Sequence, residues 1–306
     1  MREITLTIKR DLHLPVEASY VSPEKFAGKT IKEIEDIVVW EGNARLPLAD
    51  IFNVTQKTDD SEDEMTIRVI GNAAKVRRIG YRVSSGSIII EGNAGMYLGE
   101  EMKGGSIIVT GTAGSWLGMK MKGGRIEVKG NAGHYVGSGY RGATLGMKGG
   151  SILVHGNAGQ EVGCRMIDGT IRIKGSAGLL PGVHMRNGTI YVEGNCEGRA
   201  GGQMTGGKVI ISGQIPSILP SFAFEEIRDA AKVGEEKIRG PFYVFSGDMN
   251  ENGKGKISVN ARITPNSNGA RNTWRRSGSK CVEDRQCSFP SAPFQTIQQS
   301  SEQPLV

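Results

Sequence analysis

The sequence predicts an all-β fold, a right-handed parallel β-helix of about eight coils with small α/β caps at both ends. Three observations lead to this prediction. A motif that closes on a glycine recurs with a step of about 19 residues, alternating β-branched residues precede each of these glycines, and further glycines recur at fixed offsets from them. A constant short period of this kind is typical of repeat architectures.

The repeated motif reads Gly-Gly-x-Ile-x-Val-x-Gly, and its closing glycine serves as a landmark. An earlier landmark at Gly71 precedes the set Gly92, Gly111, Gly130, Gly156, Gly175, Gly194 and Gly213. Within that set the steps are equal except for a longer one from Gly130 to Gly156, and they are too short for a strand and a helix joined by ordinary loops. Short strands joined by tight turns fit this length, and stacked copies would pair in parallel about 4.8 Å apart with right-handed connections.

Positions at a fixed distance from the landmark predict columns of equivalent side chains. Ile or Val stands two and four residues before each landmark, which indicates a strand with one buried face. Glycines seven residues after the landmark mark corners, because glycine adopts positive φ without steric cost. Methionines and small residues are expected inside the coils, at Met102, Met121, Met147, Met166, Met185 and Met204 and at Ala94, Ala113, Ala132, Ala158, Ala177 and Cys196. Stacked asparagines are expected to hydrogen-bond from coil to coil, at Asn72, Asn93, Asn131, Asn157 and Asn195.

Composition divides the chain into four segments. We expect an N-terminal cap over residues 1–64, the glycine-repeat β-helix over 65–213, a C-terminal cap over 214–261 and a disordered tail over 262–306, where Ser, Gln, Asn, Pro and Arg dominate. Within the caps, helix signals begin at Ser22 and Thr30, and the spacing of apolar residues predicts an amphipathic helix over 224–233. The stretches 38–40, 242–245 and 257–259 are expected to be strands.

The charge, the hydrophobic pattern and the cysteine spacing exclude several classes of protein. The net charge is +6, but acidic residues nearly match the basic ones and the charges are scattered along the chain, so we expect no nucleic-acid binding. The N-terminus lacks the apolar core of a signal peptide, and no apolar run reaches transmembrane length. The four cysteines form no CxxC pair, and Cys196 is expected to be a buried free thiol. These features predict a cytoplasmic protein without membrane insertion.

The longer step, from Gly130 to Gly156, contains seven additional residues, around 138–144. Insertions in repeat arrays form loops on one face, often the binding face, so Tyr140 and Arg141 are the candidate contacts with a partner. The same stretch, 137–142, matches the G-x-G-x-x-G pattern of dinucleotide-binding proteins. That pattern binds a pyrophosphate only between a strand and a helix, and here another strand motif follows, so nucleotide binding is not expected.

No catalytic constellation stands out. The histidines, His13, His134, His155 and His184, share no ligand spacing, and the sequence contains no G-x-S-x-G elbow, P-loop or Cys–His pairing. The methionine column could bind a soft metal such as Cu(I), but one adaptable apolar side chain per coil is what a packed interior requires. We therefore predict no catalytic, cofactor-binding or metal-binding residue, and a role in holding other proteins.

The pattern Gly-Asn-Ala-Gly-x-x-Leu-Gly-x-x-Met-x-Gly-Gly-x-Ile-x-Val resembles the glycine-repeat β-helix at the C-terminus of the glutamate synthase large subunit. As a separate chain of this size, the sequence is similar to the C subunit of formylmethanofuran dehydrogenase. The resemblance covers residues 1–262, including the stretch Phe-Ala-Gly-Lys-Thr-Ile at 26–31. Residues from 265 onward do not resemble the family.

The resemblance implies a complex that reversibly reduces carbon dioxide and forms N-formylmethanofuran, the first step of methanogenesis. It implies as partners a molybdopterin or tungstopterin subunit, an amidohydrolase-like subunit with a dinuclear metal site, and ferredoxin-type subunits with iron–sulfur clusters. This chain would be the non-catalytic scaffold beside them, with no cofactor of its own, because the motif that carries the resemblance contains no functional residue to transfer.

Three alternatives remain open. A similar subunit serves the formyltransferase/hydrolase complex of methylotrophic bacteria, which lacks the redox step. A stand-alone β-helix enzyme would need clustered Asp, Arg or Lys on one face, whereas the arginines at 125, 165, 172 and 186 occupy different phases of the repeat. A free-standing relative of the glutamate synthase domain would be the third.

Overall fold

The chain is predominantly β-structure in a computed structural model that describes residues 2–58, 64–140 and 142–262. Helical structure within these residues is limited to short segments. These are α1 (Pro23–Phe26), α2 (Ile31–Glu35), η1 (Leu48–Asp50) and η2 (Met249–Glu251). The predicted all-β class is therefore confirmed.

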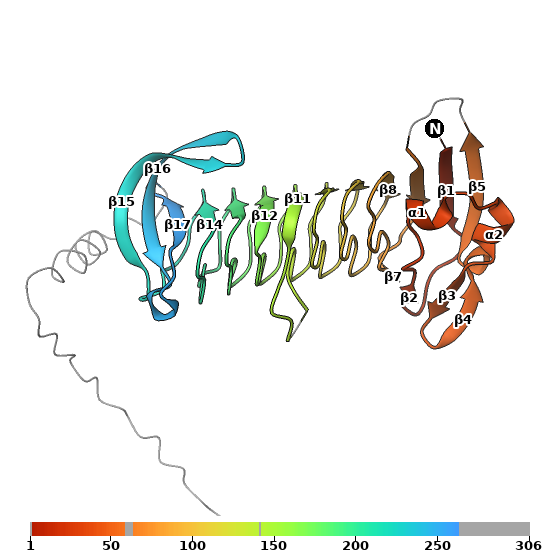
Figure 1. The fold of residues 1–306 in the computed structure, drawn as a ribbon, viewed down its shortest axis with the longest axis horizontal. Coiled ribbons are helices and arrows are strands. Elements are labelled where there is room, and N and C mark those ends of the chain that lie inside the picture. Colours follow the sequence, from red (N-terminus) through yellow and green to blue (C-terminus); the bar gives the residue numbers. More distant parts are fainter. Residues whose placement is uncertain (1, 59–63, 141, 263–306) are drawn as a thin grey trace, which may run out of the picture. The chain divides into compact units, whose positions relative to one another are not determined.

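A sheet of 13 strands runs through the described part of the chain, in the order β15-β16-β17-β14-β13-β12-β11-β10-β9-β8-β6-β1-β5 (Figure 1). The repeat strands at its centre pair in parallel, each with the next: β6 (Thr66–Ile70), β8 (Ser87–Glu91), β9 (Ser106–Val109), β10 (Arg125–Val128), β11 (Lys148–Val154), β12 (Asp168–Ile173), β13 (Thr189–Val192) and β14 (Lys208–Ile211). Parallel pairing continues to β1 (Arg2–Ile8) at one end and β17 (Gly255–Asn260) at the other. The outermost pairs are antiparallel, so the sheet is mixed.

The register between repeat strands follows the period of the sequence. Ile88 pairs with Ile107, Ile107 with Ile126, and Ile126 with Ile152 across the long step. A second line of parallel bridges links the small residues of successive repeats, at Ala73, Ala94, Ala113, Ala132, Ala158, Ala177 and Cys196. Equivalent residues therefore stack in columns, as the constant offsets predict.

The columns of Ile, Val and Met form the interior. Residues two and four positions before the landmark are buried in every repeat, and so is each methionine nine positions before it. Burying one such side chain contributes about 1.5–3 kcal/mol, so the repeated apolar positions supply much of the stability. The interpretation of the methionines as core residues is confirmed.

Glycine is required at the corners for two reasons. Gly99 has a φ of +65°, and a Cβ there would lie 2.6 Å from Cδ1 of Ile126 on a later repeat. The equivalent glycines at 118, 137, 163, 182 and 201 also have positive φ. Only glycine combines this backbone conformation with so close an approach.

The asparagines link successive repeats, with a geometry that differs from a stack of amides. The side-chain oxygen of Asn131 accepts from the backbone N–H of Asn157, and that of Asn157 accepts from the N–H of Ser176, each at 2.8 Å. Asn195 accepts from Gln214 in the same way. The expected hydrogen bonds from repeat to repeat are confirmed, with backbone donors. Asn72 instead accepts from Ala74 within its own turn.

The N-terminal segment adds a second, four-stranded sheet in the order β4-β3-β2-β7. Its strands are β2 (Val16–Glu17), β3 (Val38–Glu41), β4 (Ala44–Pro47) and β7 (Val76–Arg77), while β5 (Phe52–Thr58) joins the main sheet. Both helix signals are confirmed: α1 begins with Pro23, and Thr30 and Glu33 form a capping box at α2. Ser22 precedes α1 but makes no side-chain cap.

The prediction of a helix over 224–233 is wrong. This stretch is strand β15 (Ala223–Val233), which pairs antiparallel with β16 (Glu236–Gly247). The register shifts twice along the pair, between Phe224 and Glu226 and between Arg228 and Ala230. The first shift adds a residue to β15 and breaks its alternation of period two, so the apolar spacing imitates a helix, whereas the second shift adds a residue to β16. The expected strands within β16 and β17 are confirmed.

The hairpin β15–β16 covers the outer face of the last repeats. Val233 and Phe242 of the hairpin form a buried cluster with Tyr191 of β13 and Ile210 of β14. At the hairpin tip, Glu236 pairs with Arg172 of β12, which also pairs with Glu193. Apolar outer residues occur in β13 and β14 because the hairpin shields them from water.

Several expectations fall outside the described residues. These are the partner contact of Arg141 and the disordered tail from residue 263 onward. The residues that the structure describes contain no helix long and apolar enough to span a membrane.

Candidate interaction surface

The histidines do not converge on one site. His13 and His134 are exposed at different places, and the Nδ1 atom of His134 accepts from the backbone N–H of Gln160 at 3.0 Å. Burial lowers the pKa of His184. Within residues 2–58, 64–140 and 142–262, no group of three or more His, Cys, Asp or Glu side chains could hold a metal ion.

His155 takes part in a polar network on the outer face of the strands. Its Nε2 lies 2.8 Å from Oε1 of Glu127 on the preceding repeat, and Lys129 and Arg125 pair with the same carboxylate. Hydrogen bonds from Lys129 and His155 lower the pKa of Glu127 to about 2. The network joins adjacent repeats.

The cysteines within the described residues, Cys164 and Cys196, are buried and form no disulfide. Burial raises the pKa of the Cys164 thiol to about 12 and that of Cys196 to about 11. The thiolate, which is the nucleophilic form, is therefore disfavoured at neutral pH. The prediction of a buried free thiol at Cys196 is confirmed.

The inserted segment forms a closed loop. Its ends are joined where the N–H of Met147 donates to the carbonyl of Gly137 at 2.9 Å, and the buried Ser138 donates its hydroxyl to the Glu161 carbonyl at 2.8 Å. Tyr140 lies near the tip with 55% of its surface exposed. Strand β11 follows the loop directly, so the G-x-G-x-x-G match lacks the helix that dinucleotide binding requires.

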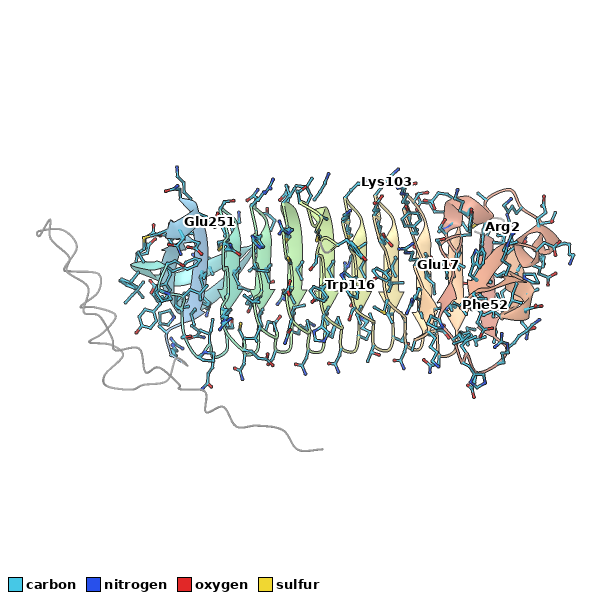
Figure 2. All side chains as sticks on the ribbon, turned by 90° about the horizontal axis from the view of Figure 1, so that it is seen from below. Arg2, Glu17, Phe52, Lys103, Trp116 and Glu251 are labelled. Atoms are coloured by element: carbon cyan, nitrogen blue, oxygen red, sulfur yellow. The ribbon has the colours of Figure 1, made fainter. Side chains whose placement is uncertain are left out.

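An aromatic ladder, which the sequence analysis did not identify, lies along one corner of the repeats. It consists of Tyr97, Trp116 and Tyr135, each five residues after a landmark and each with positive φ. The ring centroids of Tyr97 and Trp116 are 5.2 Å apart, and those of Trp116 and Tyr135 are 4.8 Å apart, with planes inclined by 15° and 13°. The position of Trp116 is labelled in Figure 2. The constant offset from the landmark could have revealed this column.

A cation and two carboxylates extend the ladder toward the N-terminal sheet. The guanidinium of Arg78 lies 5.3 Å from the centroid of the Tyr97 ring, and its Nε is 2.9 Å from Oε2 of Glu100. Glu17 lies 3.8 Å from the same guanidinium. Burial raises the pKa of both carboxyl groups. The positive charge of Arg78 therefore offsets the negative charges of two partly buried carboxylates, Glu17 and Glu100. Through Glu17, Arg78 also links β2 to the first repeats.

Comparisons with known proteins assign the chain to a family. No family profile matches the sequence. The chain is 50% identical over 275 residues to the C subunit of the tungsten-containing formylmethanofuran dehydrogenase 2 of Methanococcus maripaludis, and the match covers 88% of this chain and 99% of that one. The chain belongs to the family of formylmethanofuran dehydrogenase C subunits.

Other members of this family of C subunits match over a shorter stretch. The C subunit of the molybdenum-containing enzyme 1 of Methanosarcina barkeri is 40% identical over 98 residues, which are 32% of this chain and 33% of that one. Relatives named for either metal are thus similar to this chain, and the resemblance drawn from the repeat motif is confirmed.

A solved structure also matches. It is that of the formyltransferase/hydrolase complex from Methylorubrum extorquens with methylofuran, in which one chain superposes with a TM-score of 0.74 at 29% identity. The match covers 84% of this chain and 99% of that chain. This chain therefore shares its fold with a chain of that complex.

Proposed function

We propose that this chain is a non-catalytic scaffold subunit of a formylmethanofuran dehydrogenase complex, which reversibly reduces carbon dioxide and forms N-formylmethanofuran. The observation that carries the proposal is the 50% identity to a C subunit along 99% of the length of that chain. The inward-facing Ile, Val and Met columns and the thiols with raised pKa values support a structural role, since these side chains serve packing.

The chemistry of the complex would then lie in other subunits. These are a molybdopterin or tungstopterin subunit, an amidohydrolase-like subunit with a dinuclear metal site, and ferredoxin-type subunits with iron–sulfur clusters. Relatives whose names specify molybdenum or tungsten support this assignment. We place the complex in the cytoplasm.

The scaffold itself would be a right-handed parallel β-helix over residues 65–213, with caps formed by 1–64 and 214–261. The in-register parallel pairing of β6 and β8–β14 supports the β-helix. The antiparallel strands at both ends of the sheet support the caps, because they cover edges that would otherwise pair with other chains. Tyr140 and Arg141 would contact a neighbouring subunit, as the exposure of Tyr140 suggests.

The test is isolation of the tagged, full-length chain from its own cells, followed by identification of the attached subunits and analysis of their metals. We expect molybdenum or tungsten, iron and formylmethanofuran dehydrogenase activity to accompany the chain. Attached subunits with zinc but no pterin-bound metal would instead indicate a formyltransferase/hydrolase complex, the second candidate, which the structural match with that complex favours. An isolated chain that catalyses a reaction without any attached subunit would contradict both candidate functions.

A further inference from the structure

A line of exposed cations follows the buried methionines. Lys103, Lys122, Lys148 and Arg186 each come directly after the methionine of their repeat, and all four side chains are exposed. The backbone N–H of Lys122 donates to the carbonyl of Met102, and equivalent bonds at 2.6–2.8 Å hold the other three residues. Lys103, Lys122 and Lys148 therefore lie on successive repeats, and Arg186 follows after one repeat that has Ile167 at this position. Figure 2 shows Lys103 at an edge of the stacked repeats.

A second column runs beside the first, two residues earlier in each repeat. It consists of Arg82, Glu101, Lys120, Arg165, His184 and Gln203, all with positive φ. The backbone N–H groups of the first five donate to the next repeat, for example from Lys120 to the carbonyl of Ser138 at 3.1 Å, and that of Gln203 donates to Oδ2 of Asp248 at 3.0 Å. We call the two columns together the basic edge. Glu101 is the carboxylate within them, and it pairs with Arg82 at 2.9 Å and lies 3.9 Å from Lys122.

The basic edge differs from the outer face of the strands in how its charges are compensated. On the strand face, Glu127 and Arg172 each pair with opposite charges on their own or adjacent elements. Along the basic edge, Lys103 and Lys148 form no ion pair with the described residues, and Lys103, Lys122 and Lys148 lie on three successive repeats, whose backbones are about 4.8 Å apart. Like charges at this spacing repel, and an opposing carboxylate surface would relieve the repulsion.

The geometry points to an acidic surface of a neighbouring subunit as the occupant: we propose that the basic edge docks carboxylates of another protein of the same complex. The inference rests on the proposed function, because it assigns one contact within that complex. A nucleic acid fits less well, since binding of single strands needs free aromatic faces beside the cations. The nearby rings of Tyr97, Trp116 and Tyr135 stack on one another instead.

Carbodiimide cross-linking of the intact complex tests the contact, since it joins a lysine to a carboxylate only in direct contact. The complex is isolated with the tagged full-length chain, cross-linked, and digested for mass spectrometry. We expect peptides in which Lys103, Lys122 or Lys148 is joined to Asp or Glu of another subunit. An intact complex whose cross-links avoid all three lysines would overturn the inference and leave the proposed function standing.

A charge-reversal variant gives a second readout. Lys103→Glu, Lys122→Glu and Lys148→Glu are combined, and the control combines Lys57→Glu, Lys232→Glu and Lys237→Glu, exposed lysines outside the basic edge. We expect the amount of one partner subunit that co-purifies with the first variant to fall by about tenfold or more. The control variant should co-purify with the wild-type amount. Equal amounts of that subunit with both variants would contradict the inference. Nucleic acid that co-purifies with the wild-type chain, is removed by nuclease and is lost in the first variant would also contradict it. Wild-type chain that isolates no subunit would instead refute the proposed function.

Discussion

Trp116 stacks on Tyr135 of the next repeat with ring centroids 4.8 Å apart and planes inclined by 13°. Both residues hold left-handed backbone conformations, with φ of +60° and +65°. A non-glycine residue in this region costs about 1–2 kcal/mol, and each stacked aromatic pair contributes about 0.5–1.5 kcal/mol beyond its burial. Stacking in the aromatic ladder thus offsets the cost of positive φ at these residues. At the neighbouring corners this cost is absent, because glycine stands there.

Substitutions of Trp116 separate these two effects. Trp116→Ala loses both ring contacts and keeps the positive φ, so we expect the free energy of unfolding to fall by about 2–3 kcal/mol. Trp116→Gly loses the same contacts but relieves the backbone strain, so it should be about 1 kcal/mol more stable than the alanine variant. Guanidinium unfolding measures both, and an alanine variant as stable as the glycine variant would argue against the strain.

Glycine substitutions distinguish conformational strain from collision. Gly105 has a φ of +71°, and a Cβ there would lie 2.6 Å from the backbone carbonyl of Gly86. Gly28 has a similar φ of +72° with open space around it. We expect Gly28→Ala to lower the stability by about 1 kcal/mol and Gly105→Ala to lower it by several times that amount. Thermal unfolding compares the two, and equal losses would mean that the repeats separate easily.

Acidification tests the network around Glu127. Its pKa in the folded chain is about 2, below the value near 4.3 of an unfolded glutamate. The network therefore stabilises the fold fully above pH 4.3, and its contribution is lost as the pH falls toward 2. Because Glu127 pairs near the surface, we expect Glu127→Gln to cost about 1 kcal/mol at pH 6. Urea unfolding at a series of pH values should show this difference vanish near pH 2; a constant difference would contradict the account.

The asparagine column predicts a modest, specific loss. Asn157→Ala removes the acceptor for the Ser176 N–H, now bonded at 2.8 Å, and should lower the stability by about 0.5–1.5 kcal/mol. Asn157→Asp keeps an oxygen in the same place and serves as the matched control. Hydrogen exchange at the amide of Ser176 reports the bond directly. Protection in the alanine variant equal to that of the wild type would show that the bond is not needed.

The sequence predicts the interior of this fold better than its surface. The columns of Ile, Val and Met follow from a constant period, because interior positions admit few residue types. The strand β15 resembles a helix in sequence because the bulge between Phe224 and Glu226 breaks the alternation that identifies a strand. The C-terminal hairpin also explains why Tyr191 and Ile210 face outward, which no local pattern indicates.

The candidate surfaces were harder to predict for a physical reason. Along the chain, Lys103 comes shortly after Glu100 and Glu101, and Lys122 lies a full repeat further on, so their charges look scattered. Stacking of the repeats brings equivalent positions of successive repeats within one strand spacing, and only then do the cations adjoin. Tyr97 and Trp116 were missed in the same way. The inserted loop was located correctly because a change of period is visible in one dimension, while its partner contact remains a prediction.

The scaffold claim is tested most directly by depleting this chain from cells that make the complex. Sedimentation then gives the size of the assembly, and each remaining subunit is assayed for its own partial reaction. We predict that the remaining subunits no longer sediment together and that each still performs its partial reaction. A complex that stays assembled without this chain but loses a chemical step would contradict the account, because the chain would then contribute to catalysis.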